Sequence, residues 1–157
     1  MFLESDNIKG LVVVTPTVFY DCRGEFVSTY NTYSYKFKDR GNDVVFVEDD
    51  ISISYNGVLK GLYGDDSTCK LFHCVHGWVC MAVVDLRKRS TTYGQCELIT
   101  LSDKNHTQVF VPSGCANGHL CLSDKSVLLY KQSERYDGCS NQVTLAWDDP
   151  TANIKWP

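Results

Sequence analysis

No apolar run in this 157-residue sequence approaches the roughly 20 residues that a membrane-spanning helix requires. The first ten residues, MFLESDNIKG, do not place a basic segment before an apolar one, as a secretory signal does. We therefore expect a cytoplasmic protein that has no membrane partner.

Positive charge is also scarce, because Lys and Arg number 15 against 19 Asp and Glu, which gives a net charge of −4. A protein that binds nucleic acid by neutralising phosphates usually carries a basic surface. The one short basic cluster, LRKRS at 86–90, lies between a strand pattern and a turn and is expected to be a solvated loop. No nucleic-acid partner is predicted.

Several catalytic signatures are missing. The sequence has no Gly-x-Ser-x-Gly nucleophile elbow, no phosphate-binding loop and no dinucleotide-binding glycine pattern, so neither a kinase nor a nicotinamide-dependent enzyme is predicted. Internal repeats and linker-like tracts are absent too, and we expect a single domain over residues 1–157.

Cysteine is plentiful, but no two of the eight cysteines form a Cys-x-x-Cys pair. Several lie inside apolar strand patterns, and without a secretory signal they are expected to be reduced and mostly buried. A disulfide framework and a cysteine zinc site are the less favoured alternatives. The residues concerned are Cys22, Cys69, Cys74, Cys80, Cys96, Cys115, Cys121 and Cys139.

The four histidines do not form a recognisable metal-binding set. His73 and His76 are three apart, which in a strand places them on opposite faces. His106 lies in a polar turn and is expected to be exposed. His119 follows the turn at 112–114 and enters a strand, so it is the candidate for a ligand pocket. We predict no catalytic metal.

Strand signals dominate the remainder of the chain. Short runs rich in Val, Ile, Tyr, Phe and Thr recur every 8–12 residues between turn residues, which predicts an all-β jelly-roll sandwich. One short helix is expected near 31–39, with Asn31 as its N-cap. The expected strands are 10–15, 25–30, 44–49, 51–55, 57–62, 69–76, 78–86, 95–101, 107–112, 117–122, 126–132 and 142–147.

Charged and aromatic polar residues interrupt some of these strands. Lys60 and Lys70 flank a glycine turn, Tyr130 interrupts an apolar run, and Arg23 follows a turn. Each one alone is explained as an outward-facing strand residue. Together they suit a sandwich interior that binds an anionic, polar ligand.

A set of short collinear segments resembles the nucleotide-sugar 3,5-epimerase family, the family of dTDP-4-dehydrorhamnose 3,5-epimerase. The segments are TPTVFYDCRGEF (15–26), FVEDDIS (46–52), GVLKGLYG (57–64), CKLFHCVHG (69–77), VVDLRKRSTTYGQ (83–95), VFVPSGCANGHLCLS (109–123), LLYK (128–131) and LAWDDPTANIKWP (145–157). The stretches at 60–66 and 117–119 also look similar to the branch that acts on GDP-linked 4-keto-heptoses in capsule synthesis.

This resemblance implies a cupin-type jelly roll without metal or other cofactor, assembled as a homodimer in which one strand crosses into the partner's sheet. The implied substrate is a dTDP- or GDP-linked 4-keto sugar used for bacterial surface polysaccharide. The ketone at C4 acidifies the neighbouring protons, a cation stabilises the enolate, and protons are exchanged at C3, at C5 or at both.

The resemblance also implies residue roles. Lys70 matches the lysine that stabilises the enolate, and Tyr130 matches the tyrosine acid. Lys60 matches a pocket arginine, Arg23 matches a position that contacts the nucleotide diphosphate, and Asn117 stands where the rhamnose branch has histidine. Substrate binding is further expected from Glu48, Asp50 and His119.

Tyr63 is the main departure, because the family has its general base, a histidine, at this position. Tyrosine has a reference pKa of about 10, so it is better suited as an acid than as a base. In the rhamnose enzymes the histidine pairs with an aspartate beyond a Trp-Pro motif, and this sequence ends at Trp156-Pro157. Three interpretations stay open: an epimerase with altered machinery that includes Tyr63, a catalytically impaired sugar-nucleotide-binding homologue, and a keto-isomerase.

Overall fold

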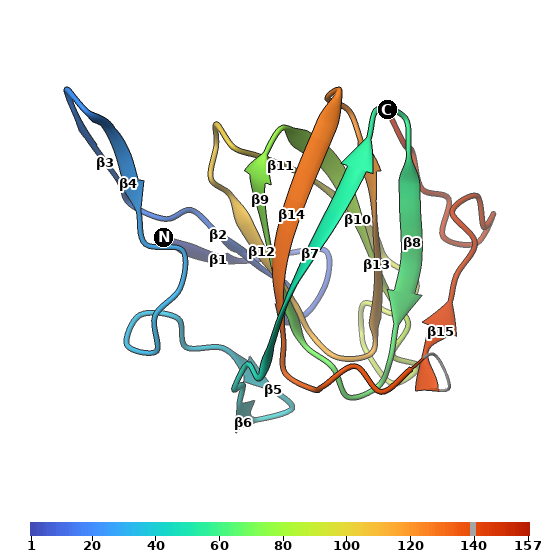
Figure 1. The fold of residues 1–157 in the computed structure, drawn as a ribbon. Helices are drawn as coiled ribbons and strands as arrows, with labels where there is room; N and C mark the ends of the chain where they lie inside the picture. The colour runs from blue at the N-terminus through green and yellow to red at the C-terminus, as the bar shows by residue number, and fades with distance from the viewer. Residues whose placement is uncertain (139–140) are drawn as a thin grey trace.

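The computed structural model describes residues 1–138 and 141–157, and these contain two β-sheets, two small hairpins and no α-helix (Figure 1). The six-stranded sheet has the order β1-β2-β12-β9-β14-β7 and the five-stranded sheet the order β11-β10-β13-β8-β15. All their strand pairs are antiparallel. The predicted all-β jelly-roll sandwich is confirmed.

The strands of the six-stranded sheet are β1 (Phe2–Glu4), β2 (Val12–Val14), β12 (Gln108–Val111), β9 (Lys70–His76), β14 (Lys125–Gln132) and β7 (Glu48–Tyr55). Those of the five-stranded sheet are β11 (Cys96–Ser102), β10 (Trp78–Asp85), β13 (Cys115–Cys121), β8 (Leu59–Gly64) and β15 (Val143–Thr144). The hairpins are β3 (Val18–Asp21) with β4 (Gly24–Val27) and β5 (Lys38–Asp39) with β6 (Asn42–Asp43).

The main core lies between the two sheets and borders the polar pocket, which Phe72 and Leu128 also line. Phe72 and Leu128 of one sheet pack in a cluster with Val79, Met81 and Leu101 of the other. All five are less than 5% exposed, and burial of each such side chain stabilises the fold by about 1.5–3 kcal/mol. This apolar cluster holds the two sheets together and forms part of the pocket lining through Phe72 and Leu128.

Strand β7 has an unusual distribution of side chains. Its even-numbered residues, Glu48 to Ser54, face the interior, and its odd-numbered residues face outward. The outward row includes Ile51, Ile53 and Tyr55, which are 65%, 47% and 64% exposed. The apolar residues thus share the outer face of the sheet with Asp49, and Glu48, Asp50, Ser52 and Ser54 occupy the inner one.

Strands β8 and β13 approach each other closely at two glycines. A Cβ on Gly61 would lie 2.5 Å from the Gly118 Cα, and a Cβ on Gly118 would lie 2.8 Å from the Lys60 carbonyl oxygen. The pairing register shifts at this point, between Asn117 and His119. Glycine is therefore required here for the strands to pair.

The expected helix at 31–39 is wrong, because residues 32–34 form only a turn. Asn31 does cap this turn, since its Oδ1 accepts hydrogen bonds from the backbone N–H groups of Tyr33 and Ser34. The chain then extends so that Tyr35 and Phe37 enter an aromatic cluster, in which Phe37 stacks on Phe110 at 4.3 Å. Tertiary packing outweighs the local capping signal.

His106 was expected to be exposed but is buried, with 9% of its surface accessible. Its Nε2 lies 3.2 Å from Glu25 Oε1, on the hairpin β3–β4, and its ring lies 6.3 Å from that of His73. The hairpin covers a turn that looks polar in the sequence. His73 is buried and His76 exposed, as the strand alternation predicted.

The cysteines confirm their prediction within the described residues: seven are free thiols, five of them buried, with Cys96 half-buried and Cys22 exposed. Cys139 lies outside the described residues. The basic segment 86–90 is a loop, although Arg87 is largely buried against Asp85. Among the described residues no helix is long and apolar enough to cross a membrane.

Candidate active site

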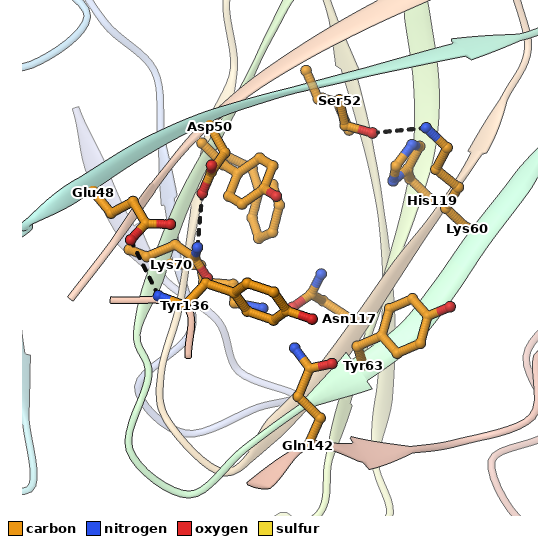
Figure 2. A pocket seen from close by; sticks show the side chains of 14 residues that line it. Glu48, Asp50, Ser52, Lys60, Tyr63, Lys70, Asn117, His119, Tyr136 and Gln142 are labelled. Carbon is orange, nitrogen blue, oxygen red and sulfur yellow. Dashed lines mark hydrogen bonds between the residues drawn. The ribbon is translucent and has the colours of Figure 1, made fainter. Parts of the chain in front are cut away.

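A polar pocket of about 260 Å³ opens between the two sheets (Figure 2). Strands β7, β9 and β14 form one wall, and β8 and β13 form the other. Eight of the nine sequence-predicted site residues line it: Glu48, Asp50, Lys60, Tyr63, Lys70, Asn117, His119 and Tyr130.

Lys70 begins β9 and is only 8% exposed. Burial lowers the pKa of its ammonium group, while the nearby carboxylates of Asp65 and Asp50 oppose this effect. A buried cation with few water molecules around it interacts strongly with a developing negative charge. Lys70 therefore suits the stabilisation of an oxyanion.

Tyr130 lies on β14 directly beside Lys70's strand. Its ring stacks on Phe72 with 5.2 Å between centroids, which fixes the direction of the hydroxyl. Burial raises the pKa of Tyr130, and Asp50 and Glu48 raise it as well. The phenol is thus held protonated, which suits a proton donor.

The two inward-facing acidic residues of β7 are engaged with neighbouring groups. Asp50 Oδ2 accepts a 2.8 Å hydrogen bond from Gln132 Nε2, and Glu48 Oε2 accepts a 3.1 Å bond from the backbone N–H of Tyr136. The antiparallel register sets Tyr130 opposite Asp50 and Gln132 opposite Glu48. These contacts fix the carboxylates around the phenol.

Lys60 and His119 occupy the opposite wall, on adjacent strands in register with each other. The Lys60 ammonium donates hydrogen bonds to Ser52 Oγ at 3.0 Å and to the Ile53 carbonyl at 2.6 Å. The His119 Nε2 lies 3.2 Å from Ser54 Oγ. Burial, and then the Lys60 charge, lower the pKa of His119 to about 4, so the ring is neutral at pH 7.

Tyr63 and Asn117 lie opposite each other in the strand pairing, and both line the pocket. Tyr63 is 44% exposed, whereas Asn117 is 8% exposed. The phenol of Tyr63 thus lies in a far wetter environment than that of Tyr130.

Arg23 is the predicted site residue that does not line this pocket. It lies in the hairpin β3–β4, which projects from the body of the molecule in Figure 1. Its Nη2 pairs with Asp21 Oδ2 at 2.6 Å, and the side chain is 86% exposed.

Sequence reasoning missed several residues that line or support the pocket: Ser52, Ser54, Phe72, Gln132, Tyr136 and Gln142. The strand alternation held a signal for some of them. Ser52 and Ser54 share a strand face with Glu48, and Gln132 shares one with Tyr130. Within the described part of the chain, no group of three or more His, Cys, Asp or Glu side chains is arranged to hold a metal ion.

Comparisons with known proteins agree with this geometry. The family model for dTDP-4-dehydrorhamnose 3,5-epimerase matches residues 5–157. The dTDP-4-dehydrorhamnose 3,5-epimerase of Methanothermobacter thermautotrophicus is 38% identical over 153 residues, which cover 96% of this chain and 81% of the relative.

Two solved structures are similar over nearly the whole fold. The dTDP-6-deoxy-D-glucose-3,5-epimerase of Legionella pneumophila, in complex with dTDP-4-keto-L-rhamnose, has a TM-score of 0.91 and 30% identity, covering 100% of this chain and 83% of its own. A 3′-monoepimerase from Streptomyces bikiniensis, in complex with dTDP-quinovose, has a TM-score of 0.89 and 25% identity, covering 99% and 79%. The cupin-type assignment of the β-sandwich is confirmed.

Proposed function

This chain belongs to the dTDP-4-dehydrorhamnose 3,5-epimerase family, and we propose that it epimerises a nucleotide-diphosphate 4-keto sugar at C3, at C5 or at both. The observation that carries the proposal is the pairing, within one pocket, of a buried ammonium group on Lys70 with a protonated phenol on Tyr130. A dTDP-linked substrate is favoured, because similar structures are complexes with dTDP sugars.

The reaction begins with loss of a proton from a carbon beside the C4 ketone. The ketone oxygen gains negative charge, and Lys70 stabilises it in surroundings where few water molecules compete. Tyr130 then delivers a proton to the carbon from its own side of the pocket. Return of the proton to the face opposite the one it left inverts the stereocentre.

The remaining predicted residues bind and orient the substrate. We assign Lys60 and Asn117 to the substrate's polar groups, with Lys60 suited to a phosphate because its ammonium lies at the pocket wall. Glu48 and Asp50 accept hydrogen bonds, so they suit sugar hydroxyls more than the anionic diphosphate.

Arg23 takes part only if a second copy of the chain supplies it, because the hairpin carries it away from its own pocket. A homodimer is supported by the outer face of the six-stranded sheet. There the exposed Ile51, Ile53 and Tyr55 lie beside Val127 and Leu129 of β14, an apolar surface that a second copy would cover. We place this assembly in the cytoplasm and in surface-polysaccharide synthesis.

The position of Tyr63 favours altered catalytic machinery. A tyrosine replaces the histidine expected from the family resemblance, and it lines the pocket with 44% of its surface exposed to solvent. The same observation supports the second candidate, a homologue that binds the sugar nucleotide without turnover.

The test is solvent deuterium uptake, followed by NMR, at C3 and C5 of a dTDP-linked 4-keto-6-deoxy sugar, with the GDP-linked 4-keto sugar in parallel. We expect exchange at one or both carbons of the dTDP substrate. Thermal stabilisation by dTDP without exchange would establish the binding homologue, and movement of the carbonyl to C3 would establish a keto-isomerase. Neither exchange nor binding with either nucleotide would contradict the proposal.

A further inference from the structure

Epimerisation at one carbon needs a second proton-transfer group on the face opposite Tyr130. Tyr130 belongs to the six-stranded sheet, so this second group must come from the facing wall of β8 and β13. Figure 2 shows this wall, with His119 and Lys60 across the pocket from Asp50, Glu48 and Lys70. Four side chains of β8 and β13 with polar groups line the pocket: Lys60, Tyr63, Asn117 and His119.

Three of these four fit the role poorly. The amide of Asn117 is far too weak a base to take a proton from carbon. The Lys60 ammonium is already engaged, because it donates hydrogen bonds to Ser52 Oγ and the Ile53 carbonyl. Tyr63 is 44% exposed, so its phenol lies partly in solvent and is not held against the pocket wall.

His119 differs from the other three because it is both buried in the pocket wall and held by a buried hydrogen-bond partner. It is 6% exposed and lines the pocket, and its Nε2 lies 3.2 Å from Ser54 Oγ. Ser54 is 2% exposed, and His119 is the partner of its hydroxyl among the described residues. A buried hydroxyl that bonds one ring nitrogen fixes the ring and leaves the other nitrogen for a ligand.

We propose that His119 is the catalytic group that exchanges the substrate proton on the face opposite Tyr130, with Ser54 as its positioning residue. This inference rests on the proposed function, and it assigns to this chain a base at a different position from Tyr63. It also changes the role expected for His119, from substrate binding to proton transfer.

The proton and the electrons are accounted for as follows. The unprotonated nitrogen of His119 takes the proton from the carbon beside the ketone, and the C–H bonding pair becomes the C=C bond of the enolate. The carbonyl π pair moves to the oxygen, where Lys70 stabilises it. Tyr130 then protonates the opposite face of the carbon as the ketone re-forms. The imidazolium loses its proton to solvent, and the phenolate regains one.

The charges in the pocket are consistent with this role. Burial and Lys60 keep the imidazole neutral, so a free nitrogen is available at pH 7. A diphosphate bound beside Lys60 offsets the lysine's charge, which makes the imidazole a stronger base when substrate is present. Binding and proton removal are thereby linked through Lys60.

The experiment compares the parent chain with His119→Gln, and with His76→Gln as a matched control on the exposed side of β9. Deuterium exchange into the dTDP-linked 4-keto-6-deoxy sugar is measured together with the thermal shift caused by dTDP. We expect His119→Gln to lose exchange by about 100-fold or more while dTDP still stabilises it. His76→Gln is expected to exchange at the parent's rate.

Ser54→Ala is the second variant, in case His119→Gln does not fold. It keeps the imidazole but removes its hydrogen-bond partner, and we expect about a tenfold loss of exchange with dTDP binding retained. Parent-like exchange by both variants overturns the role of His119 alone. Loss of exchange in Tyr63→Phe but not in His119→Gln also overturns it. A parent chain that shows no exchange overturns the proposed function, and the role of His119 with it.

Discussion

Lys70 is the residue on which the proposed chemistry depends most, since it combines a positive charge with near-complete burial. Substitution of Lys70 by Met keeps much of the side-chain volume and removes the charge. We expect a 10²–10³-fold loss of deuterium exchange, because an oxyanion-stabilising group contributes about 2.7–4 kcal/mol to the transition state.

Lys88→Met is the matched control, because Lys88 is an exposed lysine outside the pocket. Exchange by Lys70→Met within threefold of the Lys88→Met rate would remove Lys70 from the mechanism. The thermal shift with dTDP separates loss of chemistry from loss of binding.

Most of the individual site residues were predictable, but through family resemblance more than through composition. Lys60, Lys70 and Tyr130 stand out as polar residues within strands, and the structure brings them together. Ser54 and Gln132 do not stand out by residue type, since a serine or glutamine in a strand usually faces solvent, and only the alternation that they share with Glu48 and Tyr130 points to them. Their burial depends on which face of the strand lies inward, and this is set by tertiary packing.

The loop between β10 and β11 is organised by one buried carboxylate. Asp85 has no exposed surface and accepts hydrogen bonds from Arg87, Ser90 and Thr92. Burial alone would raise the pKa of Asp85, but these hydrogen bonds together outweigh it and hold the pKa well below its usual value. The sequence suggested only a solvated basic loop here.

Asp85→Asn is therefore expected to destabilise the fold strongly. The variant leaves the mostly buried Arg87 guanidinium without its carboxylate, which costs about 3 kcal/mol of unfolding free energy. Urea unfolding measures the change. Asp21→Asn is the control, because it breaks the exposed ion pair with Arg23 and should leave the midpoint unchanged. Equal midpoints for the two variants would contradict this account.

The positions of most strands were predictable from the sequence, whereas the face of each strand that lies inward was not. Runs of β-forming sequence such as 69–76 and 78–86 leave little alternative to extended structure, and β9 and β10 lie there. The predicted strand at 44–49 instead begins at Glu48 and continues through 51–55 as β7. The short strands β1 and β3 were missed, because three or four residues carry too little pattern.

Stability of the whole molecule is expected to depend on pH through buried histidines. Burial, and then His106, lower the pKa of His73 to about 4, and neither of its ring nitrogens has a hydrogen-bond partner among the described residues. An unfolded chain binds a proton at this histidine near pH 6.5, so stability is fully present above that pH and is lost as the pH falls toward 4. His119 acts in the same direction.

His73→Gln tests this dependence against His76→Gln, which changes an exposed histidine on the same strand. The melting temperature is measured from pH 7 to pH 4 for both variants. We expect a shallower decline for His73→Gln, because the variant no longer has a buried base to protonate on unfolding. Parallel curves for the two variants would show that His73 does not contribute.

The alternation of side chains along β7 decides which of its residues line the pocket and which face outward. Its inward row holds Glu48, Asp50 and two serines, and its outward row holds Ile51, Ile53 and Tyr55 together with Asp49. A slip of β7 by one residue in its pairing with β14 would exchange the two rows. Isoleucines would then face the pocket and Glu48 and Asp50 the outside, whereas a slip of two residues would restore both faces. One register error in this strand would therefore alter the proposed ligand pocket and the apolar outer surface at the same time.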